Sequence, residues 1–162
     1  YDGTEIHESV FALLALSKNN MEYICIAPNI KQHHVVNHKN GQEINEERNV
    51  LVESARIARG EIISLSELNK NEISSLVIPG GFGGAKNLSN WAFKGSEGEV
   101  LTEVKDLILH CIENKKPIGN GIITALNKDQ ARARCGSYDV KDHIKIGKGE
   151  EAANAVIAVL SK

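Results

Sequence analysis

The sequence predicts one α/β domain over residues 1–162, built on a doubly wound parallel sheet. Short apolar runs of strand length alternate along the chain with amphipathic runs at helical spacing, which is the pattern of repeated βαβ units. An apolar run at 76–78 stops at Pro79 and opens into four glycines, as a buried parallel strand does before a helix. The length of 162 residues, with 41% hydrophobic and 25% charged residues, fits one ordinary globular domain.

The first part of the chain begins with an amphipathic helix. Ile6, Val10 and Leu13 mark one apolar face, which predicts a helix over 4–18. Asp2 with Glu5 three residues later has the spacing of a capping box, so helix capping is one interpretation of Glu5. Three further elements follow in order: a strand at 22–27, a polar excursion or edge strand at 32–38, and a helix at 46–60 that ends in a glycine.

The second part of the chain continues the alternation. A short strand is expected at 61–65 and another at 76–78. Residues 97–114 have the most regular helical period in the sequence, with Cys111 on the apolar face as a core residue. The remaining expected elements are a strand start at 116–119, a turn at Asn120-Gly121, a strand at 143–146 and a final helix at 150–160.

Composition argues against several classes of partner. The net charge is −2, and the 19 basic residues are scattered among 21 acidic ones, so no basic stripe for nucleic acid is expected. The longest apolar run, 10–16, is too short to cross a bilayer and no leader precedes it, so we expect no membrane partner. Three widely spaced cysteines indicate free thiols in a reducing compartment.

Three imidazoles between 33 and 38 invite a metal interpretation, which we do not favour. His33 and His34 are adjacent and would point to opposite faces of a strand, and no carboxylate or cysteine nearby completes a ligand set. We therefore expect neither a metal nor a cofactor.

The glycine-rich turn is the candidate site. Gly80 and Gly81 are suited to present backbone N–H groups to an oxyanion at the carboxyl end of a strand, but a tight strand-to-helix turn explains them equally well. The turn is neither a dinucleotide fingerprint, because the spacing differs, nor a P-loop, because no Gly-Lys-Ser/Thr follows.

Four ordered motifs resemble one known family. They are Tyr-Asp-Gly-Thr-Glu-Ile-His-Glu at 1–8, Arg-Asn-Val-Leu-Val-Glu-Ser-Ala-Arg-Ile-Ala-Arg-Gly at 48–60, Ile-Pro-Gly-Gly-Phe-Gly-Gly-Ala-Lys-Asn-Leu-Ser at 78–89 and Lys-Pro-Ile-Gly at 116–119. The sequence resembles the ElbB-type branch of the PfpI superfamily over residues 1–119. This resemblance implies a class I glutamine amidotransferase-like domain with a flavodoxin-like, three-layer α/β/α fold.

The resemblance also implies an activity. Members of this branch are described as glyoxalases (lyases), which turn small dicarbonyl or aldehyde substrates into hydroxy acids without a metal or cofactor. The implied site has a cysteine on a nucleophile elbow, a glutamate from the first helix that Glu5 matches, and an oxyanion loop that Gly80 and Gly81 match. The resemblance further implies a homodimer, for which Trp91 and Phe93 are candidate anchors, and a cytoplasmic location, or the mitochondrial matrix in a eukaryote.

Two departures from the family pattern leave alternatives open. Ile122 stands at the nucleophile position, and the chain begins at Tyr1, where the family has a preceding strand. Either the chain is a shortened homologue without the cysteine, or the first strand and elbow region belong to a longer protein; we favour the second, because losing a central strand leaves unpaired edges. The competing function is a non-catalytic binding or scaffold homologue. An amidotransferase reaction is a weaker third, since neither a partner domain nor a His-x-Glu dyad is visible.

Overall fold

Four short parallel strands form the middle of the molecule, in two separate pairs. The fold is that of a computed structural model, which describes residues 2–122 and 148–161. Strand β1 (Cys25–Ala27) pairs with β4 (Ile62–Ser64), and β5 (Leu76–Ile78) pairs with β6 (Ile118–Asn120), both in parallel. The two strands of each pair therefore end at the same edge, and for β5 and β6 this is the edge where the glycine-rich turn begins.

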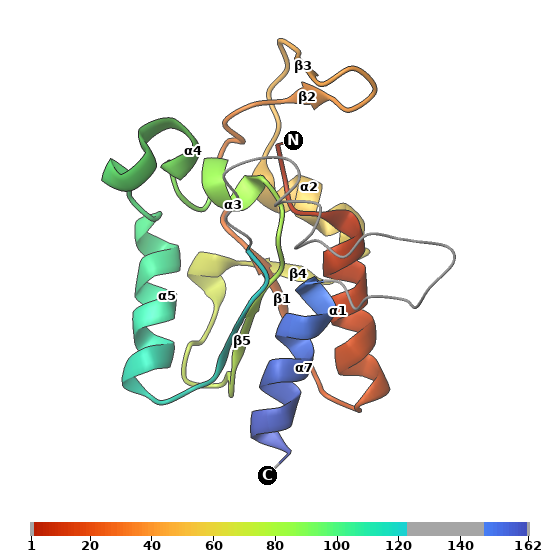
Figure 1. The fold of residues 1–162 in the computed structure, drawn as a ribbon, viewed down its shortest axis with the longest axis vertical. Helices are drawn as coiled ribbons and strands as arrows, with labels where there is room; N and C mark the ends of the chain where they lie inside the picture. The colour runs from red at the N-terminus through yellow and green to blue at the C-terminus, as the bar shows by residue number, and fades with distance from the viewer. Residues whose placement is uncertain (1, 123–147, 162) are drawn as a thin grey trace.

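Helices cover both faces of these strands. Figure 1 shows α5 on one side of the strands and α1 and α7 side by side on the other. The three-layer α/β/α arrangement predicted from the sequence is confirmed. The helices are α1 (Ile6–Lys18), α2 (Val50–Ile57), α3 (Gly83–Lys86), α4 (Trp91–Lys94), α5 (Thr102–Glu113) and α7 (Lys148–Leu160), with 3₁₀ turns η1 (Leu65–Glu67) and η2 (Gly95–Glu97).

The core is divided between the two faces. On the α5 face it consists of Leu65, Leu76, Val104, Leu107 and Cys111, and Cys111 has no exposed surface, as its place on the apolar face of the helix predicted. On the other face α1 and α7 meet through the small residues Ala12, Ala15 and Ala153, which let the two helix backbones come close together.

The α7 helix also lies very close to the sheet. A Cβ atom on Gly119 of β6 would stand 2.2 Å from the carbonyl oxygen of Ala152 in α7, a distance that real Cβ atoms do not adopt. Gly119 is therefore required by helix packing. The final helix predicted at 150–160 is confirmed, whereas the strand predicted at 143–146 lies outside the described residues.

The start of α1 differs from the sequence prediction. Its N-cap is Glu5, whose side chain accepts a hydrogen bond from the Glu8 amide, so the capping box starting at Asp2 is wrong. Asp2 is buried instead, and it accepts a hydrogen bond from the Val36 amide at 2.8 Å and contacts His38 at 2.8 Å. Asp2 thereby ties the start of the chain to the antiparallel hairpin of β2 (Val36–Asn37) and β3 (Gln42–Glu43), which stands apart at the top of Figure 1.

A large cleft separates the two strand pairs. Its volume is about 960 Å³, and its walls include Cys25–Ala27 of β1, Leu76–Ile78 of β5 and the inner side of α1. Within the described parts of the chain, no strand bridges β1 and β5, so the facing edges of both strands lack a sheet partner. Unpaired strand edges are what the loss of a central strand would leave, and the origin of that strand in a longer protein stays a prediction.

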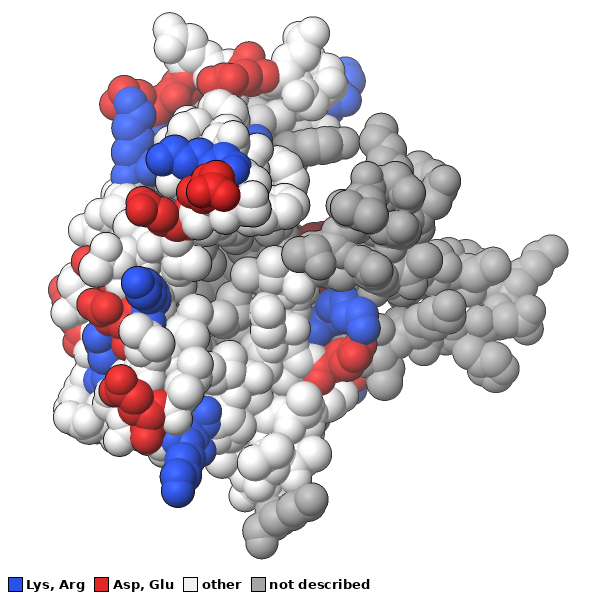
Figure 2. Space-filling model, turned by 60° about the vertical axis from the view of Figure 1, so that its left-hand side comes forward, with Lys and Arg blue, Asp and Glu red and all other residues white. Residues whose placement is uncertain are grey.

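On the face drawn in Figure 2, the lysines and arginines of the described residues are interspersed with acidic side chains. The described part of this face therefore has no continuous stripe of basic residues. None of the described helices combines the length and the apolar character needed to span a bilayer.

Candidate functional site

The glycine-rich turn after β5 is held in place by the start of the chain. The Gly80 carbonyl accepts hydrogen bonds from the Glu5 amide at 2.9 Å and from Thr4 Oγ1 at 3.1 Å, and the Gly83 amide donates to the Gly3 carbonyl at 2.8 Å. Gly81 has φ +122°, and a Cβ atom there would lie 2.3 Å from the Glu5 nitrogen. Gly81 is thus required both by its backbone conformation and by the close approach of residues 3–5.

The carboxyl group of Glu8 lies directly against this turn. Glu8 is buried, and its Oε2 atom has no hydrogen-bond partner among the described residues. A Cβ atom on Gly80 would stand only 2.0 Å from that Oε2 atom. The carboxyl group therefore occupies the space that any side chain at position 80 would need, so Gly80 must be glycine for Glu8 to be there.

The environment of Glu8 favours its protonated form. Burial raises the pKa of Glu8 and the nearby Glu5 carboxylate raises it further, while the Gly80 backbone amide and the Lys148 ammonium lower it by less. A buried carboxyl with a raised pKa, packed against the Gly80 turn that borders the cleft, has the properties of a group that holds and transfers a proton.

Glu5, the glutamate predicted for the site, lies beside it with its carboxylate turned another way. Its Oε2 accepts from the Glu8 amide at 2.7 Å, its Oε1 contacts His7 Nδ1 at 2.9 Å, and 42% of its side chain is exposed. The hydrogen bond to Glu5 raises the pKa of the exposed His7. The structure thus brings the Glu5 backbone to the Gly80 turn, whereas the carboxyl group that faces the turn belongs to Glu8.

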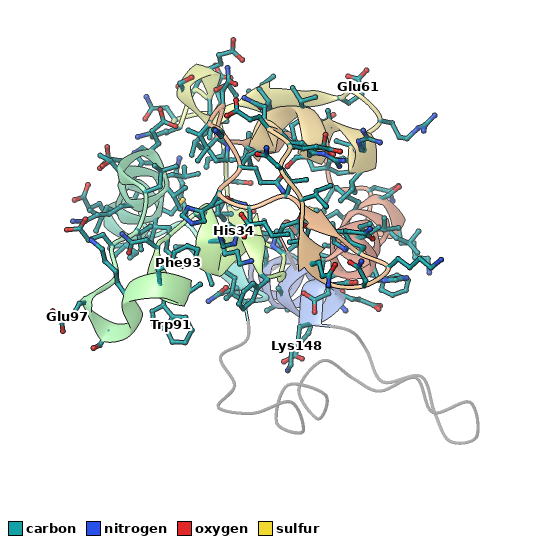
Figure 3. The ribbon with its side chains drawn as sticks, turned by 90° about the horizontal axis from the view of Figure 1, so that it is seen from above. His34, Glu61, Trp91, Phe93, Glu97 and Lys148 are labelled. Atoms are coloured by element: carbon teal, nitrogen blue, oxygen red, sulfur yellow. The ribbon has the colours of Figure 1, made fainter. Side chains whose placement is uncertain are left out.

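Residues from β6 and α7 close the site from the other side. The Gly121 amide donates to the Ile78 carbonyl at 2.8 Å, and a Cβ atom on Gly121 would lie 3.2 Å from the Gly80 nitrogen and 3.4 Å from the Lys148 carbonyl. Lys148 begins α7 (Figure 3) and forms an ion pair with Glu151. The ends of β5 and β6 and the first turns of α1 and α7 therefore converge within one small region.

The nucleophile position carries no thiol. Ile122 follows the Gly121 turn, its amide donates to Asn120 Oδ1 at 2.9 Å, and its side chain packs over Gly84. Cys111 is buried in the core under α5, and Cys25 lies in β1; burial raises the pKa of both thiols. Cys135 lies outside the described residues.

The adjacent histidines contact an aromatic side chain. The rings of His33 and His34 lie 4.1 Å and 5.5 Å from that of Phe93, and Figure 3 shows His34 beside Phe93. Within the described ranges, no group of three or more His, Cys, Asp or Glu side chains could hold a metal ion.

Sequence reasoning missed Glu8. The available signal was its position: Glu8, Ala12 and Ala15 fall at helical spacing on one side of α1, and all three are buried. A glutamate that continues a stripe of alanines lies on the side of the helix that packs against the rest of the protein, whereas Glu5 lies at the helix end.

Comparisons with known proteins identify relatives of this chain. No family model matches the chain. The chain is 46% identical over 120 residues to the rat ES1 protein homolog, mitochondrial, and equally to human Glutamine amidotransferase-like class 1 domain-containing protein 3, mitochondrial. Its homologues are glutamine amidotransferase-like class 1 domain proteins.

These amidotransferase-like relatives are longer than the chain. Both matches cover 74% of the chain but 45% of each relative, and the ES1 protein, mitochondrial, of Danio rerio is 33% identical with 46% of it covered. The chain thus spans about half the length of the curated relatives it matches.

A solved structure shares the amidotransferase-like fold. It is described as an isoprenoid biosynthesis protein with an amidotransferase-like domain from Ehrlichia chaffeensis, and it matches with a TM-score of 0.70 and 44% identity over 74% of this chain and 57% of that one. The predicted flavodoxin-like fold is confirmed by this neighbour.

Proposed function

We propose that the chain belongs to the ElbB-type branch of these homologues and acts as a cofactor-independent glyoxalase, converting small dicarbonyls to hydroxy acids. One observation carries the proposal: Glu8 presents a buried, unpartnered carboxyl oxygen to the Gly80 turn at the carboxyl ends of the strands. Ligands of doubly wound α/β proteins bind at that edge.

The reaction needs a proton to move between two adjacent carbons. Addition of a nucleophile to one aldehyde of glyoxal gives an adduct, and loss of its C–H proton gives an enediolate. Return of a proton to the neighbouring carbon reduces that carbon to an alcohol, while the first carbon becomes the carboxylic acid. Glyoxal and water together thus become glycolic acid. We assign this proton transfer to Glu8, whose Oε2 lies against Gly80, and the oxyanion side to the backbone of Gly80 and Gly81.

The nucleophile in this proposal is water or a cysteine thiol. The family pattern puts a thiol where this chain has Ile122. Of the two described cysteines, Cys111 is buried in the core, and Cys25 lines the cleft with a thiol whose pKa burial raises, which disfavours the thiolate. The described residues of the site therefore support the proton transfer, with water as the nucleophile that adds to the aldehyde. A thiol would add in the same way, and it would leave when water hydrolyses the resulting thioester.

Turnover of glyoxal and methylglyoxal tests this proposal. The wild-type chain should form the hydroxy acid, and Glu8→Gln should lower kcat by about 10²–10⁴, the usual contribution of general acid–base catalysis. Glu61→Gln is the matched control, because Glu61 is exposed and stands far from Lys148 in Figure 3. Full turnover in a folded Glu8→Gln variant would remove Glu8 from the reaction.

Two cysteine variants locate the nucleophile. If Cys25→Ser and Cys135→Ser both turn over glyoxal at the wild-type rate, water is the adding nucleophile; if one of them is inactive, that thiol takes the role. Failure of every form, including wild type, to produce a hydroxy acid would favour the alternative, a non-catalytic binding homologue, for which the replacement of the thiol by Ile122 is the supporting observation.

Partners and compartment follow from the same proposal. We propose a small dicarbonyl or aldehyde as the substrate and a second copy of the chain as the partner. The names of the curated relatives place those proteins in mitochondria; for a eukaryotic source we propose the mitochondrial matrix, and otherwise the cytoplasm.

A further inference from the structure

Glu5 is the residue that joins the two halves of the candidate site. Its amide donates to the Gly80 carbonyl at 2.9 Å, and its Oε2 accepts from the Glu8 amide at 2.7 Å. Its carbonyl accepts from the amide of Ser9 at 3.0 Å and from the Ser9 hydroxyl at 2.9 Å. One residue thus fixes the glycine turn, the first turn of α1 and the backbone of Glu8 relative to one another.

We propose that Glu5 is a positioning residue, which aims the Glu8 carboxyl at the Gly80 turn through its N-cap hydrogen bond and, through its own negative charge, makes Glu8 a stronger proton acceptor. The inference rests on the proposed function only in taking Glu8 as the proton carrier. It assigns to Glu5 a role through Glu8 and no contact with the reacting atoms.

The geometry gives the two parts of this role. The cap hydrogen bond orients the first turn of α1, from which the Glu8 side chain departs. Because Glu8 is buried, the charge of the Glu5 carboxylate one helical turn away acts on it through a medium less polar than bulk water, although the Glu5 side chain itself is partly exposed. Two negative charges at this separation disfavour each other, so a charged Glu5 favours the neutral form of Glu8.

Other charged and polar groups that face Glu8 also shift its protonation equilibrium. From α7 the Lys148 ammonium favours ionised Glu8, and from the turn the Gly80 amide does the same. Gly121, at the end of β6, adds no titratable side chain. His7 contacts the far oxygen of Glu5, so a protonated His7 offsets part of the Glu5 charge and weakens its effect on Glu8.

Two substitutions separate capping from charge. Asparagine and aspartate are both good N-cap residues, but only aspartate is charged. The side-chain carboxyl carbon of Glu8 can be titrated by ¹³C NMR in the full chain, with Glu8→Gln identifying its resonance. We expect the Glu8 titration midpoint to fall in Glu5→Asn and to stay at or near its wild-type pH in Glu5→Asp.

A control variant and two contrary outcomes complete the titration experiment. Glu61→Asn removes an exposed charge distant from the site and should leave the Glu8 midpoint unmoved. An unchanged midpoint in Glu5→Asn, with the fold confirmed by circular dichroism, would overturn the charge role, and an equal fall in both Glu5 variants would show that side-chain length rather than charge is responsible.

The titration needs no turnover, so it can fail independently of the proposed function. If wild type is inactive but the midpoints shift as expected, the glyoxalase proposal fails while the coupling of Glu5 to Glu8 stands. If wild type is active, the acid limb of its pH–rate profile should move to lower pH in Glu5→Asn, which a merely structural cap would not cause.

Discussion

Glu8 links the stability of the protein to pH in an unusual direction for a carboxyl group. Burial raises its pKa in the folded state, so the folded protein binds a proton there more tightly than the unfolded chain does. Its contribution to stability is therefore fully present below the unfolded pKa and is lost as pH rises through the folded pKa. Ionising this buried carboxyl group destabilises the fold.

Glu8→Gln should reveal this linkage in chemical denaturation. The variant should be more stable than wild type at neutral pH, with the difference shrinking as pH falls and disappearing below the ordinary glutamate range. Denaturant midpoints at several pH values measure it. A constant difference at every pH would mean that Glu8 does not titrate with folding.

Gly81 allows the glycine turn to be tested separately from the chemistry. Gly81→Ala combines strain at φ +122° with a contact of 2.3 Å to the Glu5 nitrogen, so it should cost well over the ~1 kcal/mol expected from strain alone. Gly41→Ala is the matched control, because Gly41 has φ +76° and nothing within 4 Å of the added Cβ. Equal losses in denaturation free energy would show that the close approach at Gly81 costs nothing.

At the scale of elements, the close contact between β6 and α7 requires a residue without a side chain at position 119. Gly119→Ala would push the added Cβ into the carbonyl of Ala152, and because that atom is helix backbone, the whole of α7 must shift. We expect a loss of about 1–3 kcal/mol in the free energy of unfolding, the usual range for overpacked cores, or somewhat more. Thermal unfolding of Gly119→Ala against Gly3→Ala, whose Cβ would meet nothing within 4 Å, checks this; similar melting temperatures would contradict the tight contact.

Elements with a strong local pattern were predictable, and elements defined by distant contacts were not. The helix over 97–114 was found from its period, but it starts later, at Thr102, because a separate 3₁₀ turn that begins at Gly95 (φ +54°) and is capped by the extended Gly98 precedes it. The four-residue helices α3 and α4 are too short to show a period. Glu8 escaped because its role arises from residues 80, 121 and 148, which are brought together only by the fold.

At the scale of the whole molecule, association remains a prediction. Trp91 and Phe93 are 50% and 45% exposed on α4, and Figure 3 shows Trp91 directed away from the body of the protein, whereas Phe93 is partly covered by His33. Trp91 is therefore the better candidate for an interface anchor. Light scattering at micromolar concentration should give a dimer mass for wild type and a larger monomer fraction for Trp91→Ala; a monomeric wild type would end the dimer proposal.

The cleft between the strand pairs has a consequence for hydrogen exchange. Successive amides of a strand point to opposite sides, so in β1 and β5 some face a paired neighbour and the next faces the cleft. Within three residues of one strand, slowly exchanging amides should therefore alternate with amides that exchange about as fast as those of a loop. An extended segment that binds in the cleft would slow the exchange of the fast amides in β1 and β5 together. The exchange rates of these few amides therefore report whether the cleft is open or filled.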